Sequence, residues 1–498
     1  MKQAELYNKV LNATKWSAMT EIAAKLVSPI TSMVLARVVT PEAFGVVATV
    51  TMIVSFADMF TDSGFQKYLV QHEFKSEKDK YKNANVAFWS NFVFSIFLWG
   101  LIFIFRQPIA TLVGNPGLGN VLAIACLQLP LTSFSSIQMA LFRRNFDFKT
   151  LFTVRIITIL IPIVITIPLA FAGLNYWSLI IGTLVMQVSN AALLTLKSNW
   201  KPKFFYSIKI FKEMLSFSVW SLIEAISIWL TTWIDAFIIG NLINQYYLGL
   251  YKTSMTMVNT IMALVTASTL PVIFSTLSRL QNNNTEFKKM FFKFQRIVSI
   301  LIFPLGVGIY LYSDLATQLL LGNQWKEASN IIGIWAITSA IIIVFGYSNS
   351  EVYRAKGMPK LSFLSQLLHL IFLVPVIVIS GHYGFWALVY SRSWARLQGS
   401  LVGFIIMKYV IGIPILKTIS NVLPTAISAI GMGILGLVLK YINHGIIWEF
   451  FSIFLCALIY FILLFLFPNM RTEFLLLVRK VLPNKIVVKY QNRLQRES

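Results

Sequence analysis

Long apolar runs alternate with short polar connections along most of the chain. A helix that spans a bilayer needs about 20 mostly apolar residues, and fourteen runs reach that length. They lie near residues 15–39, 43–65, 84–105, 119–142, 150–171, 175–196, 213–240, 247–277, 289–312, 328–350, 361–380, 384–407, 418–439 and 446–467. No connection is long enough for a folded domain outside the membrane. The pattern therefore predicts an all-α, polytopic membrane protein of about fourteen transmembrane helices.

The composition agrees with this pattern. Hydrophobic residues make up 57% of the chain and charged residues 12%, whereas soluble domains carry about 25% charged residues. The net charge of +23 would by itself suggest nucleic acid. However, 32 of the 42 Lys and Arg residues lie in one alternating set of connections, and four lie in the other set. Because cytoplasmic loops are enriched in Lys and Arg, this split predicts cytoplasmic N- and C-termini and explains the charge without nucleic acid.

Two stretches of the chain are similar at an offset of 204 residues. Trp16 matches Trp220 and Gly45 matches Gly249, each within a pair of spans joined by a tight turn. Two six-span lobes in the same orientation suit alternating access around a site near the membrane midplane. The expected organisation is an N-lobe over 1–200, a C-lobe over 201–410, spans 13 and 14 over 411–470, and a basic cytoplasmic tail over 471–498.

The first two spans of each lobe carry polar residues at steps of three and four, which places them on one helical face. A charge at the centre of a spanning helix costs about 2.5–3.5 kcal/mol, so charged side chains there are expected to face protein or a watery cavity. The candidate substrate-binding cations are Lys25, Arg37, Arg155, Lys252, Arg296, Arg392 and Arg396. The candidate ion-coupling carboxylates are Asp58, Asp62, Glu224 and Asp235.

Simpler roles are open for several of these residues. Glu21 lies four residues before Lys25, so the two can neutralise each other. The carboxylates of the second span can pair with Lys67. Two arginines near the predicted cytoplasmic ends of their spans, Arg155 and Arg296, can extend to the membrane interface.

Motifs of enzymatic chemistry are missing from the sequence. It contains no Walker A loop, GxSxG elbow, HExxH motif or dinucleotide fingerprint, and its N-terminus lacks the apolar region of a signal peptide. The histidines have no metal-ligand spacing, and Cys126 and Cys456 lie inside apolar runs. We therefore expect no metal, no cofactor and no disulfide framework. Because no ATP-binding motif is present, any transport by this chain would draw on an ion gradient or on mass action.

Four segments resemble a known family. LARVVTPEAFGVVATVTMIVSFADMFTDSGFQKYLVQ (35–71) closely resembles the first hairpin of the bacterial polysaccharide transporters, the Wzx-type flippases of the multidrug/oligosaccharidyl-lipid/polysaccharide exporter superfamily. Segments 141–150, 233–256 and 352–360 are similar to the family's loop between spans 4 and 5, its span 7–8 hairpin and its loop after span 10. The TPEAFG hairpin is most similar to the subgroup of colanic-acid and teichuronic-acid exporters. The chain departs at Asn241, where relatives often carry an arginine.

The resemblance implies a fold, a function and a location. The fold is fourteen helices in two lobes around a V-shaped cavity. The function is that of a flippase, not an enzyme, which moves an undecaprenyl-pyrophosphate-linked oligosaccharide (an O-antigen, capsule or exopolysaccharide unit) outward across the bacterial cytoplasmic (inner) membrane. The implied partners are the lipid-linked oligosaccharide, membrane lipids, H⁺ or Na⁺, and the polysaccharide polymerase and glycosyltransferases.

Three other functions remain as alternatives. A drug or cation exporter of the same superfamily favours a net acidic cavity, whereas six basic and five acidic residues lie within the spans. No residue pattern distinguishes a peptidoglycan lipid II flippase from the oligosaccharide flippase described above. A membrane glycosyltransferase or polymerase generally needs a sizeable outer loop with catalytic residues, and the longest outer loops, near 106–118 and 313–327, are short.

Overall fold

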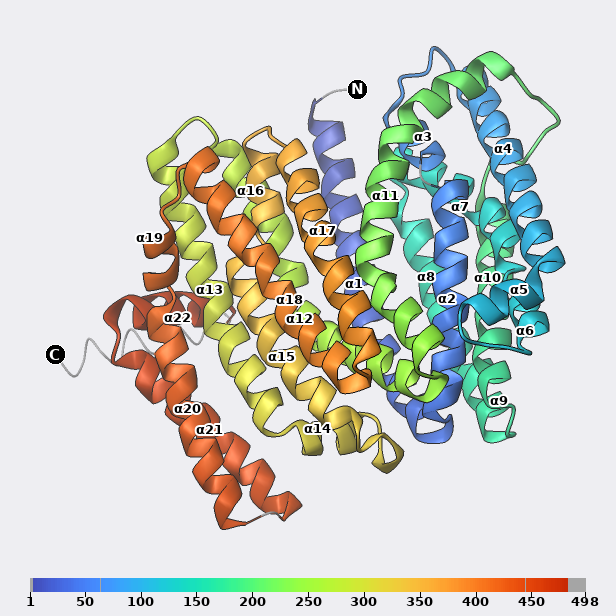
Figure 1. The fold of residues 1–498 in the computed structure, drawn as a ribbon. Helices are drawn as coiled ribbons and strands as arrows, with labels where there is room; N and C mark the ends of the chain where they lie inside the picture. Colours follow the sequence, from blue (N-terminus) through green and yellow to red (C-terminus); the bar gives the residue numbers. More distant parts are fainter. Residues whose placement is uncertain (1–2, 63, 444, 482–498) are drawn as a thin grey trace. The chain divides into compact units, whose positions relative to one another are not determined.

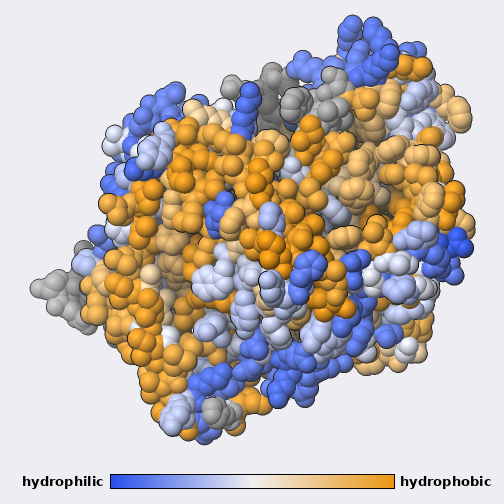
Figure 2. All heavy atoms as spheres, in the orientation of Figure 1, coloured by the Kyte–Doolittle hydropathy of each residue, from blue (hydrophilic) through white to orange (hydrophobic). Residues whose placement is uncertain are grey.

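The structure, a computed structural model, describes residues 3–62, 64–443 and 445–481. These residues form helices joined by short loops, with no β-strand among them (Figure 1). Thirteen helical segments of the described chain are long and apolar enough to cross a membrane. Figure 2 shows hydrophobic side chains over most of the visible face. The expected all-α, polytopic membrane fold is confirmed.

Span 12 (384–407), the one predicted span outside these thirteen segments, coincides with α18 (Phe385–Ile406), a continuous helix of 22 residues. Arg392, Arg396 and the neighbouring serines and glutamine lower its mean hydropathy, so it is less apolar than the other thirteen. A helix of this length nevertheless reaches across the hydrocarbon core of a bilayer. The polar residues of α18 therefore need partners inside the protein.

The first six predicted spans form the first half of the chain. Four are single helices: α1 (Gln3–Val38), α2 (Pro41–Asp62), α4 (Glu77–Ile104) and α10 (Tyr176–Lys197). Span 4 consists of α6 (Gly119–Ala125) and α7 (Gln128–Arg144), and span 5 of α8 (Phe148–Ile161), the π-helical turn η1 (Pro162–Thr166) and α9 (Ile167–Phe171). The interruption in span 5 begins at Pro162, because proline has no N–H to continue the helical hydrogen bonds. The connections hold α3 (Phe65–Gln71) and α5 (Arg106–Leu112).

The second half repeats this order. Its spans are α11 (Ile208–Leu242), α12 (Gln245–Arg279), α13 (Asn284–Leu311), α15 (Ala328–Phe345) with α16 (Asn349–Ala355), α17 (Lys360–His382) and α18. Its connections hold α14 (Ser313–Leu320) and the 3₁₀ turn η2 (Asn323–Trp325). Helices α4 and α13 are each 28 residues long, and α10 and α18 are each 22. These two pairs of spans match in length, whereas α2 and α12, with 22 and 35 residues, do not.

The last part of the chain forms five further elements: η3 (Met407–Ile411), α19 (Ile415–Ser420), α20 (Leu423–Ile442), α21 (Ile446–Phe465) and α22 (Pro468–Val481). Helices α20 and α21 are the expected spans 13 and 14 and pack against each other. Both α20 and α22 contact α13.

The chain divides into two compact units. The first comprises Met1–Ser254, Leu320–Lys326 and Leu373–Arg392, and the second comprises Met255–Leu319, Glu327–Phe372 and Ser393–Ser498. In the first unit, α2 packs against α4, α7 and α11, and α11 also contacts α3 and α4. The first helix of the second half therefore belongs, by its contacts, to the first unit.

Helices α2 and α12 meet at their first turns, within the first unit. A Cβ atom on Gly45 would overlap the backbone carbonyl of Gln245, and a Cβ atom on Gly249 would overlap the carbonyl of Pro41. Gln245 follows Pro41 by 204 positions, as Gly249 follows Gly45. The contact is therefore reciprocal, the pattern of an isologous interface between two similar surfaces. Only glycine allows the two backbones to approach this closely.

Side-chain amides and an indole reinforce the same end of the first unit. Gln245 Nε2 donates to the Gly114 carbonyl at 2.9 Å. Trp325 Nε1 donates at 2.6 Å to the carbonyl of Ala36, which lies in the last turn of α1. Gly114 has a positive φ of 75° and lies against Gly240 at the end of α11. Direct contacts between the two halves of the chain thus close this end of the unit.

Candidate functional site

A polar pocket of about 660 Å³ lies inside the first unit, between α2, α3, α4, α7, α10 and α11. Twelve of its sixteen lining residues have polar side chains. They are Ser55, Asp58, Gln66, Lys67, Gln71, Asn91, Thr132, Ser135, Ser136, Arg143, Gln187 and Asn190. Because binding pockets usually carry only a few polar groups, this lining offers an unusual number of hydrogen-bonding groups to a ligand.

Helical spacing brings these side chains to one wall. On α7, Thr132, Ser136 and Arg143 recur at steps of four and seven, so they share a face. On α10, Gln187 and Asn190 are one turn apart and line the same pocket. The pocket is therefore built on regular helices, which hold functional groups more rigidly than loops do.

Buried hydrogen bonds fix the wall between α4 and α7. Asn91 Nδ2 donates to Ser136 Oγ at 3.0 Å, and Asn91 Oδ1 accepts from Ser95 Oγ at 3.2 Å. Ser133 Oγ donates to Ser95 Oγ at 3.1 Å. Asn91 is 1% exposed and Ser95 is fully buried. A satisfied buried network of this kind rigidifies the helices that it joins.

The charges of the pocket are two cations and one carboxylate. Lys67 and Arg143 line it together with Asp58, whose Oδ1 accepts a long 3.5 Å hydrogen bond from Thr132. Arg143 Nη1 donates to Gln66 Oε1 at 3.4 Å. The side chain of the other predicted carboxylate of this helix, Asp62, lies outside the described residues. The net positive charge and the many amides and hydroxyls suit a ligand that carries both phosphate and sugar hydroxyl groups.

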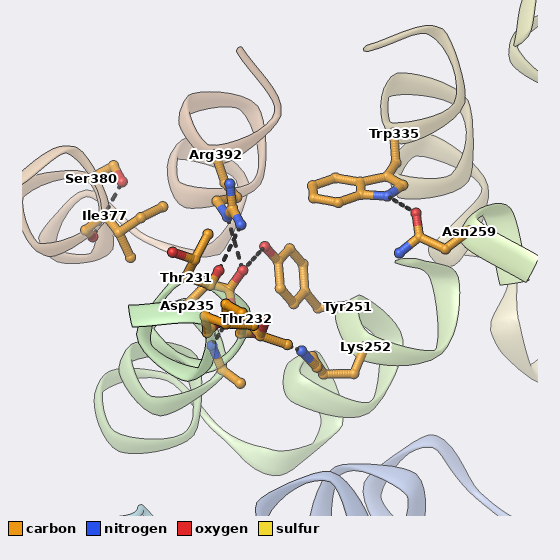
Figure 3. A network of polar contacts seen from close by, with 12 residues as sticks. Thr231, Thr232, Asp235, Tyr251, Lys252, Asn259, Trp335, Ile377, Ser380 and Arg392 are labelled. Atoms are coloured by element: carbon orange, nitrogen blue, oxygen red, sulfur yellow. Dashed lines mark hydrogen bonds and ion pairs between the residues drawn. The ribbon is translucent and has the colours of Figure 1, made fainter. Parts of the chain in front are cut away.

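A second polar cluster joins α11, α12 and α18 in the first unit (Figure 3). Asp235 is fully buried, and its Oδ2 accepts from Arg392 Nε at 3.0 Å and from Tyr251 Oη at 2.8 Å. Arg392 Nη2 also donates to the Thr231 carbonyl at 3.0 Å. Two residues predicted for different roles, the carboxylate for ion coupling and the arginine for substrate binding, are thus brought together as an ion pair.

Lys252 borders this cluster. Its Nζ donates to the Thr232 carbonyl at 3.0 Å and lies 4.1 Å from the centre of the Trp233 ring. A cation over an indole face is stabilised by the ring quadrupole, most strongly where water is excluded. The predicted cation Lys252 is therefore positioned on α12 beside α11, close to the Asp235–Arg392 pair in Figure 3.

Arg396 belongs to the second unit and contacts residues of that unit. Its guanidinium lies 3.7 Å from the centre of the Trp335 ring, and its Nη1 donates to Ser339 Oγ at 3.0 Å. Trp335 in turn donates from Nε1 to Asn259 Oδ1 at 3.1 Å. Although one helical turn separates Arg396 from Arg392, the two arginines bind different helices, α15 and α11.

The remaining predicted cations lie apart from the pocket. Lys25 is half-buried on α1, and Arg155 is exposed on α8. Arg37 is exposed at the end of α1, where its side-chain stem lies against Gly322. The side chain of the predicted carboxylate Glu224 lies outside the described residues.

Arg296 forms an ion pair that the sequence pattern does not reveal. Its Nη2 lies 2.8 Å from Glu473 Oε1, and its Nη1 donates to Asn421 Oδ1 at 2.8 Å. Glu473 is on α22 and Asn421 lies just before α20, so the pair ties both to α13. This geometry is that of a structural contact.

The sequence matches the model of a family described as "Polysaccharide biosynthesis protein" over residues 34–330, which is more than half of the chain. The chain belongs to this family. Its expected resemblance to polysaccharide exporters is therefore confirmed.

The curated relatives of this chain carry names from polysaccharide biosynthesis. The "Succinoglycan biosynthesis transport protein ExoT" of Rhizobium meliloti (strain 1021) is 24% identical over 329 residues, which cover 66% of this chain and 65% of ExoT, just under two thirds of its length. The "Lipopolysaccharide biosynthesis protein WzxC" of Escherichia coli (strain K12) is 20% identical, with 76% of each chain covered. The "Teichuronic acid biosynthesis protein TuaB" of Bacillus subtilis (strain 168) is 21% identical over 71% of this chain and 73% of TuaB.

Two solved structures share the fold of this chain. A structure titled "Lipid II flippase MurJ, inward closed conformation" superposes with a TM-score of 0.73 at 16% identity, covering 90% of this chain and 97% of that chain. An inward-facing multidrug resistance MATE family transporter of the MOP superfamily gives a TM-score of 0.59 at 13% identity, covering 80% and 95%. At these identities the likeness concerns the fold alone.

Sequence reasoning missed most of the polar pocket. Lys67 and Arg143 were interpreted as connection residues because they follow apolar runs. Gln187 and Asn190 lie in a predicted span, and their spacing of three was the available signal. A search for polar residues at helical spacing in every span of this family member, instead of charged residues alone, would have found them.

Proposed function

We propose that this polysaccharide-biosynthesis family member moves a lipid-linked oligosaccharide across the bacterial cytoplasmic membrane. The observation that carries the proposal is the pocket of about 660 Å³ with twelve polar side chains, set among membrane-spanning helices. Its amides and hydroxyls suit sugar hydroxyl groups, and its Lys67 and Arg143 suit phosphate oxygens. The names of the relatives, which include a succinoglycan transport protein, support the same substrate class.

The distribution of Lys and Arg determines the proposed orientation of the chain and the direction of transport. The 32-to-4 split of Lys and Arg between alternating connections favours cytoplasmic N- and C-termini. With that orientation, Arg143 stands at the cytoplasmic end of α7, and Lys67 lies on α3 in the cytoplasmic connection between spans 2 and 3. The pocket therefore takes the headgroup of a lipid from the inner leaflet, and the reciprocal contact of Gly45 with Gly249 closes the outer end.

Alternating access follows from the repeat. The proposed lobes are residues 1–200 and 201–410, followed by spans 13 and 14 over 411–470 and the basic tail over 471–498. When the outer contact opens, the headgroup is released to the outer leaflet. A ligand shifts such an equilibrium only by binding the two states with different affinity. Asp58 is the proposed coupling carboxylate because it shares the pocket with the substrate cations, and H⁺ or Na⁺ is the proposed coupling ion.

The other predicted residues, which do not line this pocket, have separate proposed roles. Lys252 is proposed as a later contact of the anionic headgroup, and Arg396 stays a predicted substrate-binding cation. The Asp235–Arg392 pair is proposed to hold α18 against α11 in one state and to separate in the other. Arg296, paired with Glu473, is proposed to anchor the C-terminal helices.

The charges of the pocket also bear on the alternative functions, a drug or cation exporter and a lipid II flippase. A drug or cation exporter would place net negative charge around its substrate, whereas this pocket holds two cations and one carboxylate. The fold likeness to a lipid II flippase leaves that function as the second candidate, since its substrate also joins a sugar to a lipid through phosphate groups.

Deletion of the gene tests the proposal. We expect a lipid-linked oligosaccharide to accumulate in the inner leaflet and surface polysaccharide to fall, and we expect the intact gene to restore export. A Lys67→Ala, Arg143→Ala variant should not restore it, whereas Lys67→Arg should retain most of it. Accumulation of lipid II in place of another lipid-linked oligosaccharide would select the second candidate, and no change in any lipid-linked sugar would refute both.

A further inference from the structure

A second cavity of about 750 Å³ lies in the first unit, and apolar side chains form its lining. It runs between α2, α4, α5 and α11 and includes Phe56, Phe60, Leu101, Phe105, Leu112 and Trp229. Phe105 is 52% and Leu112 60% exposed, so the cavity is a groove open to its surroundings. In a chain that spans the membrane, such a groove faces hydrocarbon.

The groove adjoins the polar pocket along α2. Ser55 and Asp58 of this helix line the polar pocket, whereas Met52 and Phe56 line the groove. The stretch from Met52 to Phe60 is about 12 Å long at 1.5 Å per residue. Two faces of the same two turns of α2 therefore separate a polar compartment from an apolar one.

Trp229 of α11 stands at the boundary. Its indole N–H donates to Ser55 Oγ at 3.1 Å and to the Met52 carbonyl at 3.2 Å, and its ring lies 4.9 Å from that of Phe56 inside the groove. Ala225, one turn earlier on α11, lines the polar pocket. The indole thus presents its polar edge to the pocket side and its ring to the groove, as tryptophan does at polar–apolar boundaries.

We propose that this groove binds the polyisoprenoid tail of the same lipid-linked substrate whose headgroup enters the polar pocket. The inference rests on the proposed function and adds where the tail lies. The two compartments lie on adjacent faces of α2, and this adjacency favours one occupant with a polar, anionic end and a long apolar end. Lys67 and Arg143 attract the phosphate end, and no side chain of the described groove offers a partner to a second polar group.

Selectivity for the tail comes from shape. Lipid chains are as apolar as the groove, so exclusion of water contributes little in a bilayer. Van der Waals contact is what distinguishes one chain from another. We therefore expect the aromatic wall of Phe56, Phe60 and Trp229 to favour a methyl-branched, unsaturated chain over a straight acyl chain. A bound tail also keeps the headgroup at high local concentration beside its pocket.

Photo-crosslinking of the full-length, reconstituted chain tests the inference. The probe is undecaprenyl pyrophosphate with a diazirine in its tail. We expect labelled peptides from α2, α4 and α11, and we expect unlabelled undecaprenyl phosphate to compete. Equal competition by phosphatidylglycerol would overturn the inference and identify an ordinary lipid site, and labelling confined to helices outside the groove would overturn it as well.

Matched variants separate the tail site from transport itself. Leu101→Trp fills the groove and should lower labelling about tenfold, and it should slow transport of the long-tailed substrate more than that of a short-prenyl analogue. Phe97→Trp, on the same helix but outside the groove lining, should change neither. Phe56→Ala should also weaken labelling if Leu101→Trp fails to fold.

The two possible failures are distinguishable. If the wild-type chain transports the long-tailed substrate while both groove variants retain labelling and transport, the tail site is refuted and the proposed function stands. If the wild-type chain transports no lipid-linked sugar, the proposed function is refuted.

Discussion

Substitution of Gly45 or Gly249 by alanine should push the protein out of the conformation described here. A Cβ atom on Gly249 would lie 2.7 Å from the Pro41 carbonyl carbon and 2.9 Å from the Gly45 nitrogen, whereas ordinary contacts begin at 3.4 Å. Both neighbours are backbone atoms and cannot turn aside as a flexible side chain can. The Pro41 carbonyl oxygen lies nearer still to this Cβ atom, so the helices α2 and α12 must separate by well over about 0.7 Å for the contact to become ordinary.

The magnitude follows from the cost of such overpacking, about 1–3 kcal/mol. Alanine also favours a helix over glycine by about 1 kcal/mol, but this gain is equal in both conformations and cancels. If the contact opens during alternating access, the steric overlap raises the free energy of the closed state alone. The ratio of open to closed molecules should therefore rise by a factor of about 5–150.

Cysteine accessibility at Ala36 measures this ratio. Ala36 is fully buried beneath Trp325 at the same end of the unit, and both native cysteines, Cys126 and Cys456, are buried and can be replaced by alanine. In this background, an Ala36→Cys reporter should react faster with a membrane-impermeant maleimide when Gly249→Ala is added.

Gly100→Ala is the matched control. Gly100 also lies inside a helix, α4, but a Cβ atom there meets no heavy atom within 4 Å. It should leave the reaction rate unchanged. Equal rates in the parent, Gly45→Ala and Gly249→Ala proteins, each folded to the same level, would refute the reasoning, because the overlap would then not bear on opening.

Three further predictions concern charges and topology. Asp235→Asn should leave the buried Arg392 without its counter-ion and lower the free energy of unfolding by about 3–5 kcal/mol, measured by thermal unfolding in detergent. An Asp235→Asn, Arg392→Gln double variant should recover part of this loss. A double variant no more stable than the single one would contradict an ion pair. Glu473→Gln should lower stability by about 1–3 kcal/mol, and the loss should vanish when Arg296 is already Gln. Reporter fusions after Arg471 should be active only in the cytoplasm, and activity on the outer side would refute the proposed orientation.

The membrane fold could be predicted because apolar run length and Lys/Arg asymmetry depend only on local sequence. Helix α18 illustrates the limit of hydropathy alone, since two arginines and their polar neighbours lower its mean value while the helix remains continuous. The repeat offset found at Gly45 and Gly249 also predicted which residues of the two halves correspond. It could not predict that these glycines touch.

The polar side chains were harder to assign because their partners are distant in the sequence. Asp235 and Arg392 are 157 positions apart, and nothing local in either helix indicates that they pair. Local spacing predicted that Asp58 lies on a polar face. The amides and hydroxyls around it come largely from four other helices, so the pocket exists only once those helices pack.

Transport by the purified protein is the most direct test of the central claim. Proteoliposomes would hold a fluorescent undecaprenyl-pyrophosphate-linked oligosaccharide, and an impermeant quencher would report the leaflet in which it resides. We predict that the wild-type chain accelerates exchange between leaflets above protein-free vesicles, that Lys67→Ala, Arg143→Ala abolishes the acceleration, and that fluorescent phosphatidylglycerol is not exchanged. Exchange of the oligosaccharide lipid at the protein-free rate, or at the same rate as phosphatidylglycerol, would contradict the account.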